Sequence, residues 1–263
     1  MRGSLPKILL PAATGVVVLA LWYGVHFFLV EERRFMLPTP LAVLRAFFDN
    51  AAYLAAAAVN TSLGALLGFS LAVVVSFSLS LVLSLSPLVR ASLYPYLMAL
   101  QLTPIPILAP IAIIWTSAGL QSVTLLTFAM AFFPLIVNTT QGLISVDRNQ
   151  VELFRLYRAS RLQELFFLRV PAALPFFFTG LRIAATLAPI AAVVADMNAG
   201  TSAGGSAGLG FAAIIFSTQA KYPALFATAA TTCILGFAFN AAIVWIARLA
   251  LQHWHDSYER TDR

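Results

Sequence analysis

The sequence predicts an all-α integral membrane protein with six transmembrane helices, on the basis of its composition, its apolar segments and the placement of its charges. Of the 263 residues, 60% are hydrophobic and only 10% are charged, and the mean hydropathy is +0.89. Soluble domains carry about 25% charged residues, so this chain lacks the side chains to cover a water-facing surface. The net charge of +6 indicates membrane topology and not nucleic-acid binding, because the arginines stand beside apolar segments.

Six apolar segments are long enough to cross the hydrocarbon core, which requires about 20 residues of helix. They lie at residues 8–30, 60–85, 92–115, 121–143, 174–198 and 224–250. The first follows Arg2 and Lys7 and could be mistaken for a secretory signal. Its apolar run is too long for a signal, and no small-residue cleavage site closes it. We therefore expect it to stay in the protein as an anchor.

The lysines and arginines predict the orientation of these segments. If the N-terminus is inside, eleven of them face the cytoplasm: Arg2, Lys7, Arg90, Arg148, Arg155, Arg158, Arg161, Arg169, Arg248, Arg260 and Arg263. Four fall outside: Arg33, Arg34, Arg45 and Lys221. This asymmetry follows the positive-inside rule, so both termini and the loop 147–171 are expected in the cytoplasm.

Three regions are predicted along the chain. Residues 1–57 form the anchor and an external segment, in which Pro38 and Pro40 give an extended entry to a helix at the interface. Residues 58–251 form the transmembrane domain, and residues 252–263 form a polar cytoplasmic tail. The glycine- and serine-rich stretch 200–210 is expected to be an external turn.

The densest run of charge lies in the predicted cytoplasmic loop, between Val151 and Pro175. Charged side chains recur there every three or four residues, and apolar side chains stand between them, which predicts a pair of amphipathic helices. The charged residues are Glu152, Arg155, Arg158, Arg161 and Glu164. We expect the first helix to open at Glu152, a break near Arg158–Ser160, and a second helix that ends at Arg169. Such a loop has the character of a docking surface for a soluble partner.

This loop resembles the cytoplasmic signature of the permease subunits of type I binding-protein-dependent ABC importers. The signature begins Glu-Ala-Ala, has a glycine six residues after the glutamate, and ends at a proline nineteen residues after it. Glu152 and Pro171 keep that spacing, but Leu153 and Phe154 replace the alanines and Arg158 replaces the glycine. An arginine costs about 1 kcal/mol or more at this turn if its φ is positive. The resemblance implies these ATPase-coupling residues: Glu152, Leu153, Phe154, Arg155, Arg158, Ala159, Ser160 and Arg161.

Several other segments resemble the nitrate, sulfonate, taurine and pyrimidine-precursor branch of these permeases. They are LPTP, SPLVRASLYPYLMALQLTPIPILAP, FFPLIVNTTQGL and LPFFFTGLRIAA, which together with the loop extend the resemblance over most of residues 37–250. The resemblance implies a homodimer in the bacterial inner membrane, two ABC ATPase subunits that use ATP, and an extracytoplasmic solute-binding protein. It implies no cofactor on this chain and a small solute such as a sulfonate, nitrate, or a pyrimidine or vitamin precursor.

Polar residues within the apolar segments are candidates for lining the pathway. Gln101 and Thr103 stand in the third segment among four prolines, which predict a broken helix, although a packing kink gives the same pattern. The other candidates are Asn138, Thr139, Arg182 and Asp196. Buried polar groups also serve helix packing, so a structural role remains the alternative for each of these four.

No residues have the spacing of a catalytic or metal site. The histidines have no ligand partner at metal spacing, and the phosphate-binding pattern GxxxxGK[ST] does not occur in the sequence. The chain is therefore expected to be a transport subunit and not an enzyme. Two alternatives stay open, an ion-coupled secondary transporter, which would usually show inverted repeats, and a membrane enzyme, which would need a reactive group with its base or metal.

Overall fold

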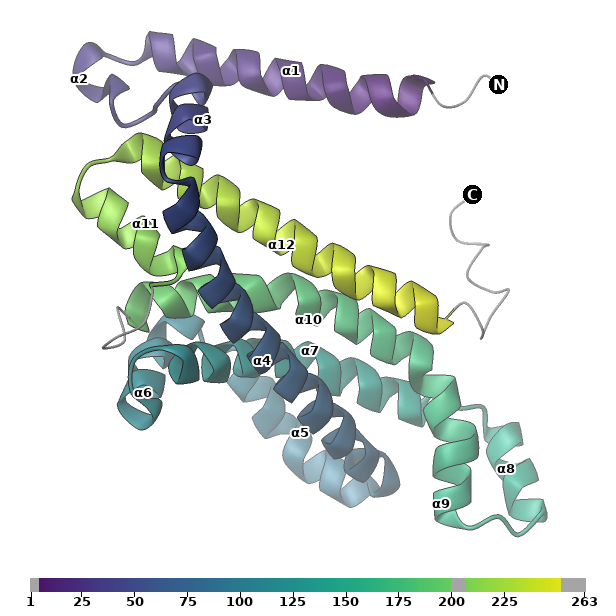
Figure 1. Cartoon of the computed structure of the whole chain (residues 1–263). Helices are drawn as coiled ribbons and strands as arrows, with labels where there is room; N and C mark the ends of the chain where they lie inside the picture. The colour runs from purple at the N-terminus through teal and green to yellow at the C-terminus, as the bar shows by residue number, and fades with distance from the viewer. Residues whose placement is uncertain (1–4, 200–206, 252–263) are drawn as a thin grey trace.

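The computed structural model describes residues 5–199 and 207–251, and within these ranges it contains helices and short turns but no strand (Figure 1). The predicted all-α class is therefore confirmed. The helices are α1 (Leu5–Phe28), α2 (Glu31–Arg34), α3 (Pro40–Asp49), α4 (Ala51–Leu85), α5 (Pro87–Gln101), α6 (Ile105–Thr116), α7 (Leu120–Ile144), α8 (Arg148–Leu156), α9 (Arg161–Glu164), a π-helical segment (Leu165–Arg169), α10 (Val170–Ala199), α11 (Leu209–Thr218) and α12 (Tyr222–Leu251).

The centre of the bundle is made by α4, α7 and α10, which pack along most of their lengths. Small side chains allow this close packing. A Cβ added to Gly68 of α4 would lie 2.6 Å from the carbonyl oxygen of Thr124 in α7, and one added to Gly64 would lie 2.5 Å from Val123 Cγ1. The spacing of these two glycines, four residues apart, thus serves close contact between α4 and α7. The core around them consists mainly of alanine, leucine and phenylalanine.

Five helical stretches are long and apolar enough to cross a membrane, and a bent pair gives a sixth. Four of the six agree closely with the expected segments, and the other two contain the expected segment within a helix that begins earlier. The second span begins at Ala51 and not at residue 60, so the expected domain boundary after residue 57 lies inside α4. The fifth span is part of one helical stretch, Arg161–Asn198. The expected end of a helix at Arg169 is therefore wrong, because the π-helical segment Leu165–Arg169 continues directly into α10 at Val170.

The third span is broken, as its prolines predict. Helix α5 ends at Gln101, and α6 leaves it at an angle of 104° after residues 102–104. Pro104 precedes the first residue of α6 in an extended conformation. The proline ring both fixes φ and removes a backbone donor, so the chain turns here and cannot continue as one helix.

The segment before the bundle contains the expected extended entry and short helix. The Thr39 side chain caps α3 by accepting a hydrogen bond from the Ala42 N–H, and Pro40 occupies the first turn. The entry is held against α1: Trp22 Nε1 donates to the Pro38 carbonyl at 3.0 Å, and His26 Nδ1 lies 2.6 Å from the Leu37 carbonyl oxygen. These bonds fix the end of α1, while most of α1 stands apart from the bundle (Figure 1).

The short helix α11 was not predicted. It follows the glycine- and serine-rich stretch, of which residues 200–206 lie outside the described part, and packs on α10, α4 and α12. The tail 252–263 also lies outside the described residues. In Figure 1 the last turns of α12, the first turns of α1 and the α8–α9 hairpin lie on one side of the molecule, and α2, α6 and α11 lie on the other.

Candidate functional site

The α8–α9 hairpin turns through a residue in the left-handed conformation. Arg158, which stands where the resembling signature has glycine, has φ of 55°. The Ala159 N–H donates to the Phe154 carbonyl and the Arg158 N–H to the Arg155 carbonyl, which is the hydrogen-bond pattern of a Schellman motif. The expected break near Arg158–Ser160 is thus confirmed, and the turn is built with a side chain that this backbone conformation disfavours.

The next helix starts immediately after this turn with two reciprocal hydrogen bonds. Ser160 Oγ accepts from the Gln163 N–H, and Gln163 Oε1 accepts from the Ser160 N–H, which together form a capping box. At the other end of the hairpin, the Asp147 carboxylate caps α8 by accepting from the Asn149 N–H. Helix α8 therefore begins at Arg148, four residues before the predicted start at Glu152. All three ends are fixed by local hydrogen bonds, so the hairpin has a defined shape.

The hairpin exposes both apolar and charged side chains. Leu153 is 51% exposed and Leu156 is 81% exposed, and Tyr157 beside them is also exposed. Phe154 is half-buried, in contrast to its neighbour. The remaining coupling candidates except half-buried Ala159 are exposed: Glu152, Arg155, Arg158, Ser160 and Arg161. Exposed apolar side chains with a charged surround are characteristic of a surface that binds another protein.

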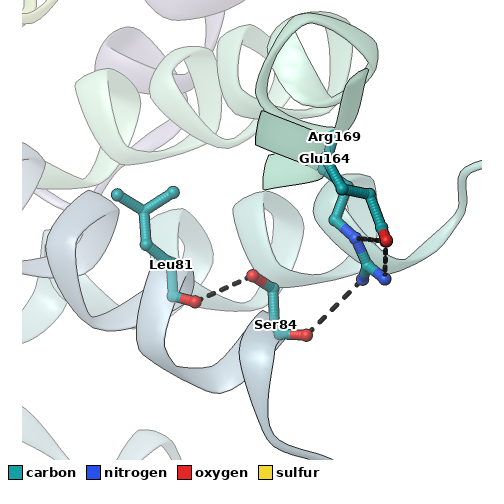
Figure 2. Close-up of polar contacts among 4 residues, drawn as sticks. All are labelled: Leu81, Ser84, Glu164 and Arg169. Atoms are coloured by element: carbon teal, nitrogen blue, oxygen red, sulfur yellow. Dashed lines mark hydrogen bonds and ion pairs between the residues drawn. The ribbon is translucent and has the colours of Figure 1, made fainter. Parts of the chain in front are cut away.

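Glu164 does not join this charged stripe, so the prediction for it was wrong. Its side chain is only 11% exposed and forms an ion pair with Arg169, with the Nη2 of Arg169 2.5 Å and its Nε 2.8 Å from Oε1 of Glu164. Arg169 Nη1 also donates to the carbonyl of Ser84 near the end of α4, at 3.5 Å (Figure 2). The π-helical segment lies between the two charged residues. On an α-helix, two residues that are five positions apart would not face each other. The i→i+5 pattern of the π-helical segment brings Glu164 and Arg169 to the same side.

A pocket of about 360 Å³ lies at the bend of the third span, and two of the candidate pathway residues line it. Gln101 and Thr103 form its polar part, and α7 and α10 contribute apolar walls that include Phe133 and Leu187. The volume is within the range of small-molecule sites, which are mostly apolar with a few polar groups. That Gln101 and Thr103 line the pathway remains a prediction; both residues do line this cavity.

Asn138 and Thr139 lie inside the bundle and are not among the residues that line this pocket. The Asn138 Nδ2 donates to the Pro134 carbonyl at 2.7 Å, and its Cβ lies 3.0 Å from the position of a Cβ on Gly180. Thr139 is fully buried and its hydroxyl has no partner. The surroundings of both residues are those of helix packing between α7 and its neighbours, while their role in a pathway remains a prediction.

Arg182 lies on an exposed face of α10, among other polar residues. Thr179 and Thr186, three residues before it and four after, are exposed on the same side of the helix. Thr186 accepts a hydrogen bond from the Asn240 Nδ2 of α12 at 2.7 Å. An arginine at this depth is costly against lipid and normally faces water or another protein segment. This face of α10 is therefore a candidate contact with a second subunit or with an aqueous path.

Asp196 joins three helices by hydrogen bonds. Thr61 Oγ1 of α4 donates to its Oδ2 at 2.5 Å and accepts from the Leu209 N–H, and the Gly210 N–H also donates to the carboxylate. These two N–H groups belong to the first turn of α11, whose orphan donors favour a negative partner. A Cβ on Gly208 would lie 2.0 Å from Oδ2, so glycine is required for this approach. The position is that of a structural cap for α11; a pathway role for Asp196 remains a prediction.

Two parts of this arrangement had no clear signal in the sequence. The pairing of Glu164 with Arg169 depends on a π-helical turn, for which the spacing of the residues gives no indication. The capping of α11 joins residues 135 positions apart in the chain. Within the described residues, no group of three or more His, Cys, Asp or Glu side chains is placed to hold a metal ion.

The chain belongs to the family described as binding-protein-dependent transport system inner membrane component, whose model matches residues 64–253. It is therefore a multi-pass membrane protein and a permease of the ABC importer class. The family match favours this class over the secondary transporter and the membrane enzyme. The matched region includes the bend, the α8–α9 hairpin and Asp196, but begins after Thr61, the partner of Asp196 in α4.

Three relatives show how far the similarity extends. The riboflavin transport system permease protein of Chloroflexus aurantiacus is 35% identical over 225 residues, which cover 85% of this chain and 82% of the relative. A probable ABC transporter permease protein of Haemophilus influenzae is 30% identical over 91% of this chain and 96% of its own length. The formylaminopyrimidine transport permease protein of Halalkalibacterium halodurans is 38% identical, but the match spans 60% of this chain and 61% of the relative, less than two thirds of its length.

Proposed function

We propose that two copies of this chain form the membrane pathway of an ATP-driven importer in the bacterial inner membrane. An extracytoplasmic binding protein delivers a small solute to one side of the pathway, and two separate ATPase subunits bind the α8–α9 hairpin on the other. This chain itself needs no cofactor, because ATP is used by the ATPase subunits. The observation that carries the proposal is the hairpin with its capped helices and exposed apolar side chains, in a chain of this family.

The orientation supports the same arrangement. The hairpin, the start of α1 and the end of α12 share one side of the molecule (Figure 1), and the excess of arginine and lysine supports a cytoplasmic location for this side. The hairpin thus faces the compartment in which ATP is available. Helix α11 and the bend between α5 and α6 lie toward the other side, where a binding protein would deliver solute.

The exposed face of α10 supports the second copy and the pathway. Arg182, Thr179 and Thr186 are too polar for contact with lipid, and a second subunit or a water-filled path would satisfy them. The pocket at Gln101 and Thr103 provides space for a small molecule beside this face. Relatives are named for formylaminopyrimidine, riboflavin and nitrate, and we infer a solute of this range, a pyrimidine or vitamin precursor, a sulfonate or nitrate.

The test is co-purification of the ATPase subunit from the native host with a tagged permease that carries Leu153→Ala and Leu156→Ala. Both side chains are more than half exposed, so their removal should leave the permease folded. Burial of each against a partner contributes roughly 1.5–3 kcal/mol, and we expect the double variant to lose most of its ATPase. Phe154 is unsuitable for this test because it is half-buried in the permease itself.

Ile234→Ala provides the matched control, since Ile234 is 59% exposed on α12, outside the hairpin. It should retain the ATPase at the wild-type level. Retention of the ATPase by the double variant, together with full uptake, would show that the hairpin is not the docking surface. If instead the double variant itself unfolds at a lower temperature, the two leucines belong to the core and the docking proposal fails.

A further inference from the structure

The hairpin is joined to the bundle in two ways. Along the chain it continues into α7 through residues 145–147 and into α10 through the π-helical segment. Neither connection runs through α4 or α5, which end at Leu85 and Gln101, well before α8 begins at Arg148. The direct bond between the base of the hairpin and the end of α4 is the one from Arg169 to the Ser84 carbonyl, shown in Figure 2.

The Ser84 carbonyl is a natural partner for an arginine. It belongs to the last turn of α4, where the helix itself supplies no donor, and a cation is favoured at this end of a helix. The Ser84 hydroxyl is also engaged, because its Oγ donates to the Leu81 carbonyl at 2.8 Å (Figure 2). One residue beyond α4, Ser86 caps α5 by accepting from the Val89 N–H. Helices α4 and α5 are therefore connected by the single residue Ser86, whose side chain caps α5.

The arginine is itself held by Glu164. The ion pair is largely removed from water, with 11% of the Glu164 side chain and 23% of the Arg169 side chain exposed. A buried ion pair contributes little net stability compared with well-packed apolar side chains, and its value lies more in fixing one geometry. Apolar packing already joins the same elements, because Leu165 contacts Leu143 and Ala173 with Leu81 beside them. These apolar contacts already pack the base of the hairpin against the bundle, so the ion pair is not required for packing.

We propose that the ion pair of Glu164 and Arg169, bridging the π-helical segment and bonded to the end of α4, is the positioning contact that carries movement of the hairpin to α4 and α5. The inference rests on the proposed function, in which an ATPase moves the hairpin. Helix α5 ends at the bend that bears the pocket. A shift of Arg169 would therefore be passed on to the pocket through α4 and α5, in addition to the connections of the hairpin to α7 and α10.

The experiment uses the importer complex, purified through a tag on this chain from its native host and placed in lipid nanodiscs. Cys233→Ala removes the cysteine of the sequence, and Ala99→Cys carries an environment-sensitive bimane fluorophore on α5, near the bend but outside the pocket lining. ATP with vanadate is added, and the change in bimane emission reports movement of α5. No solute has to be known for this measurement.

Arg169→Met should abolish most of the nucleotide-dependent emission change. The ATPase should still co-purify and hydrolyse ATP. Arg169→Met combined with Glu164→Gln removes both charges, so no uncompensated charge stays buried and the unfolding temperature should return to near that of the wild type. The emission change should stay lost in this double variant, and Arg169→Lys, which keeps the charge, should recover part of it.

The matched control is Glu31→Gln, which breaks the exposed ion pair of Glu31 with Arg34 and should leave the response unchanged. Recovery of the full emission change by the double variant along with its stability would show that the pair has only a structural role and would overturn the inference. A full response in Arg169→Met would overturn it as well. If the wild-type protein brings down no ATPase and gives no response, the proposed function fails, which is a different result from the loss of response in the variants alone.

Discussion

The hydroxyl of Thr61 in α4 lies 2.5 Å from the carboxylate of Asp196 in α10, and the same hydroxyl oxygen accepts the N–H of Leu209 at the start of α11. One small side chain therefore joins three helices that are distant in the sequence. Thr61 is fully buried, so no water replaces either bond if the hydroxyl is removed.

Thr61→Val is expected to destabilise the permease by about 1–3 kcal/mol, because a buried carboxylate and a buried N–H each lose a partner. Thermal unfolding of the purified chain in detergent measures this. Thr228→Val provides the control, since the hydroxyl of this equally buried threonine bonds only the Ala224 carbonyl of its own helix. Equal unfolding temperatures for the two variants would show that the Thr61 cluster does not hold α11.

Arg158→Gly is expected to stabilise the hairpin by about 1 kcal/mol, because glycine adopts the positive φ of 55° without steric cost. Arg158→Ala removes the same charged side chain but retains a Cβ, so it should give no such gain. The difference between the two unfolding temperatures isolates the contribution of the backbone. A gain of the same size in both variants would indicate that the arginine side chain, and not its conformation, is unfavourable.

Glycine-to-alanine substitutions should have opposite effects on stability at a close helix contact and on an open helix surface. Gly68→Ala should cost about 1–3 kcal/mol, because the added Cβ meets the α7 backbone. Gly236→Ala on α12 should stabilise by about 0.5–1 kcal/mol, because nothing lies within 4 Å of its Cβ and alanine favours the helix. Unfolding of the purified chain is again the measurement. A neutral Gly68→Ala would mean that α4 and α7 can move apart freely.

Sidedness is tested with single cysteines in the Cys233→Ala background. Gln150→Cys lies on exposed α8 and Gln219→Cys on the exposed turn between α11 and α12. An impermeant maleimide added to spheroplasts should label Gln219→Cys and leave Gln150→Cys unlabelled until the cells are opened. Labelling of Gln150→Cys in intact spheroplasts would reverse the orientation and separate the hairpin from cytoplasmic ATP.

The sequence predicted those parts of the fold that depend on local patterns. Length and hydropathy gave the spans, prolines gave the bend between α5 and α6, and the position of Arg158 gave the turn of the hairpin. The boundaries at Ala51 and Arg161 were missed because alanines and amphipathic helices continue a span with no break in the backbone. Composition shows where lipid begins more clearly than where a helix begins.

The missed contacts of the candidate site are those that depend on tertiary structure. Glu164 looked like a member of the exposed charged stripe, because the α-helical period places it there. The π-helical segment changes the facing of the residues that follow, and Arg169 then becomes its partner. The role of Asp196 as a cap likewise required the position of α11, which follows a stretch with no periodic pattern.

Helix α4 is 35 residues long, about 52 Å at 1.5 Å per residue, and both of its contact clusters lie on this single rod. Thr61 binds the start of α11 near one end, and the Ser84 carbonyl binds Arg169 near the other, about 35 Å away along the axis. If α4 couples binding events at its two ends, the coupling free energy must be the same in both directions. In the proposed importer, a binding protein bound near α11 should therefore change the affinity of the ATPase subunits for nucleotide by the same factor by which nucleotide changes the affinity for the binding protein.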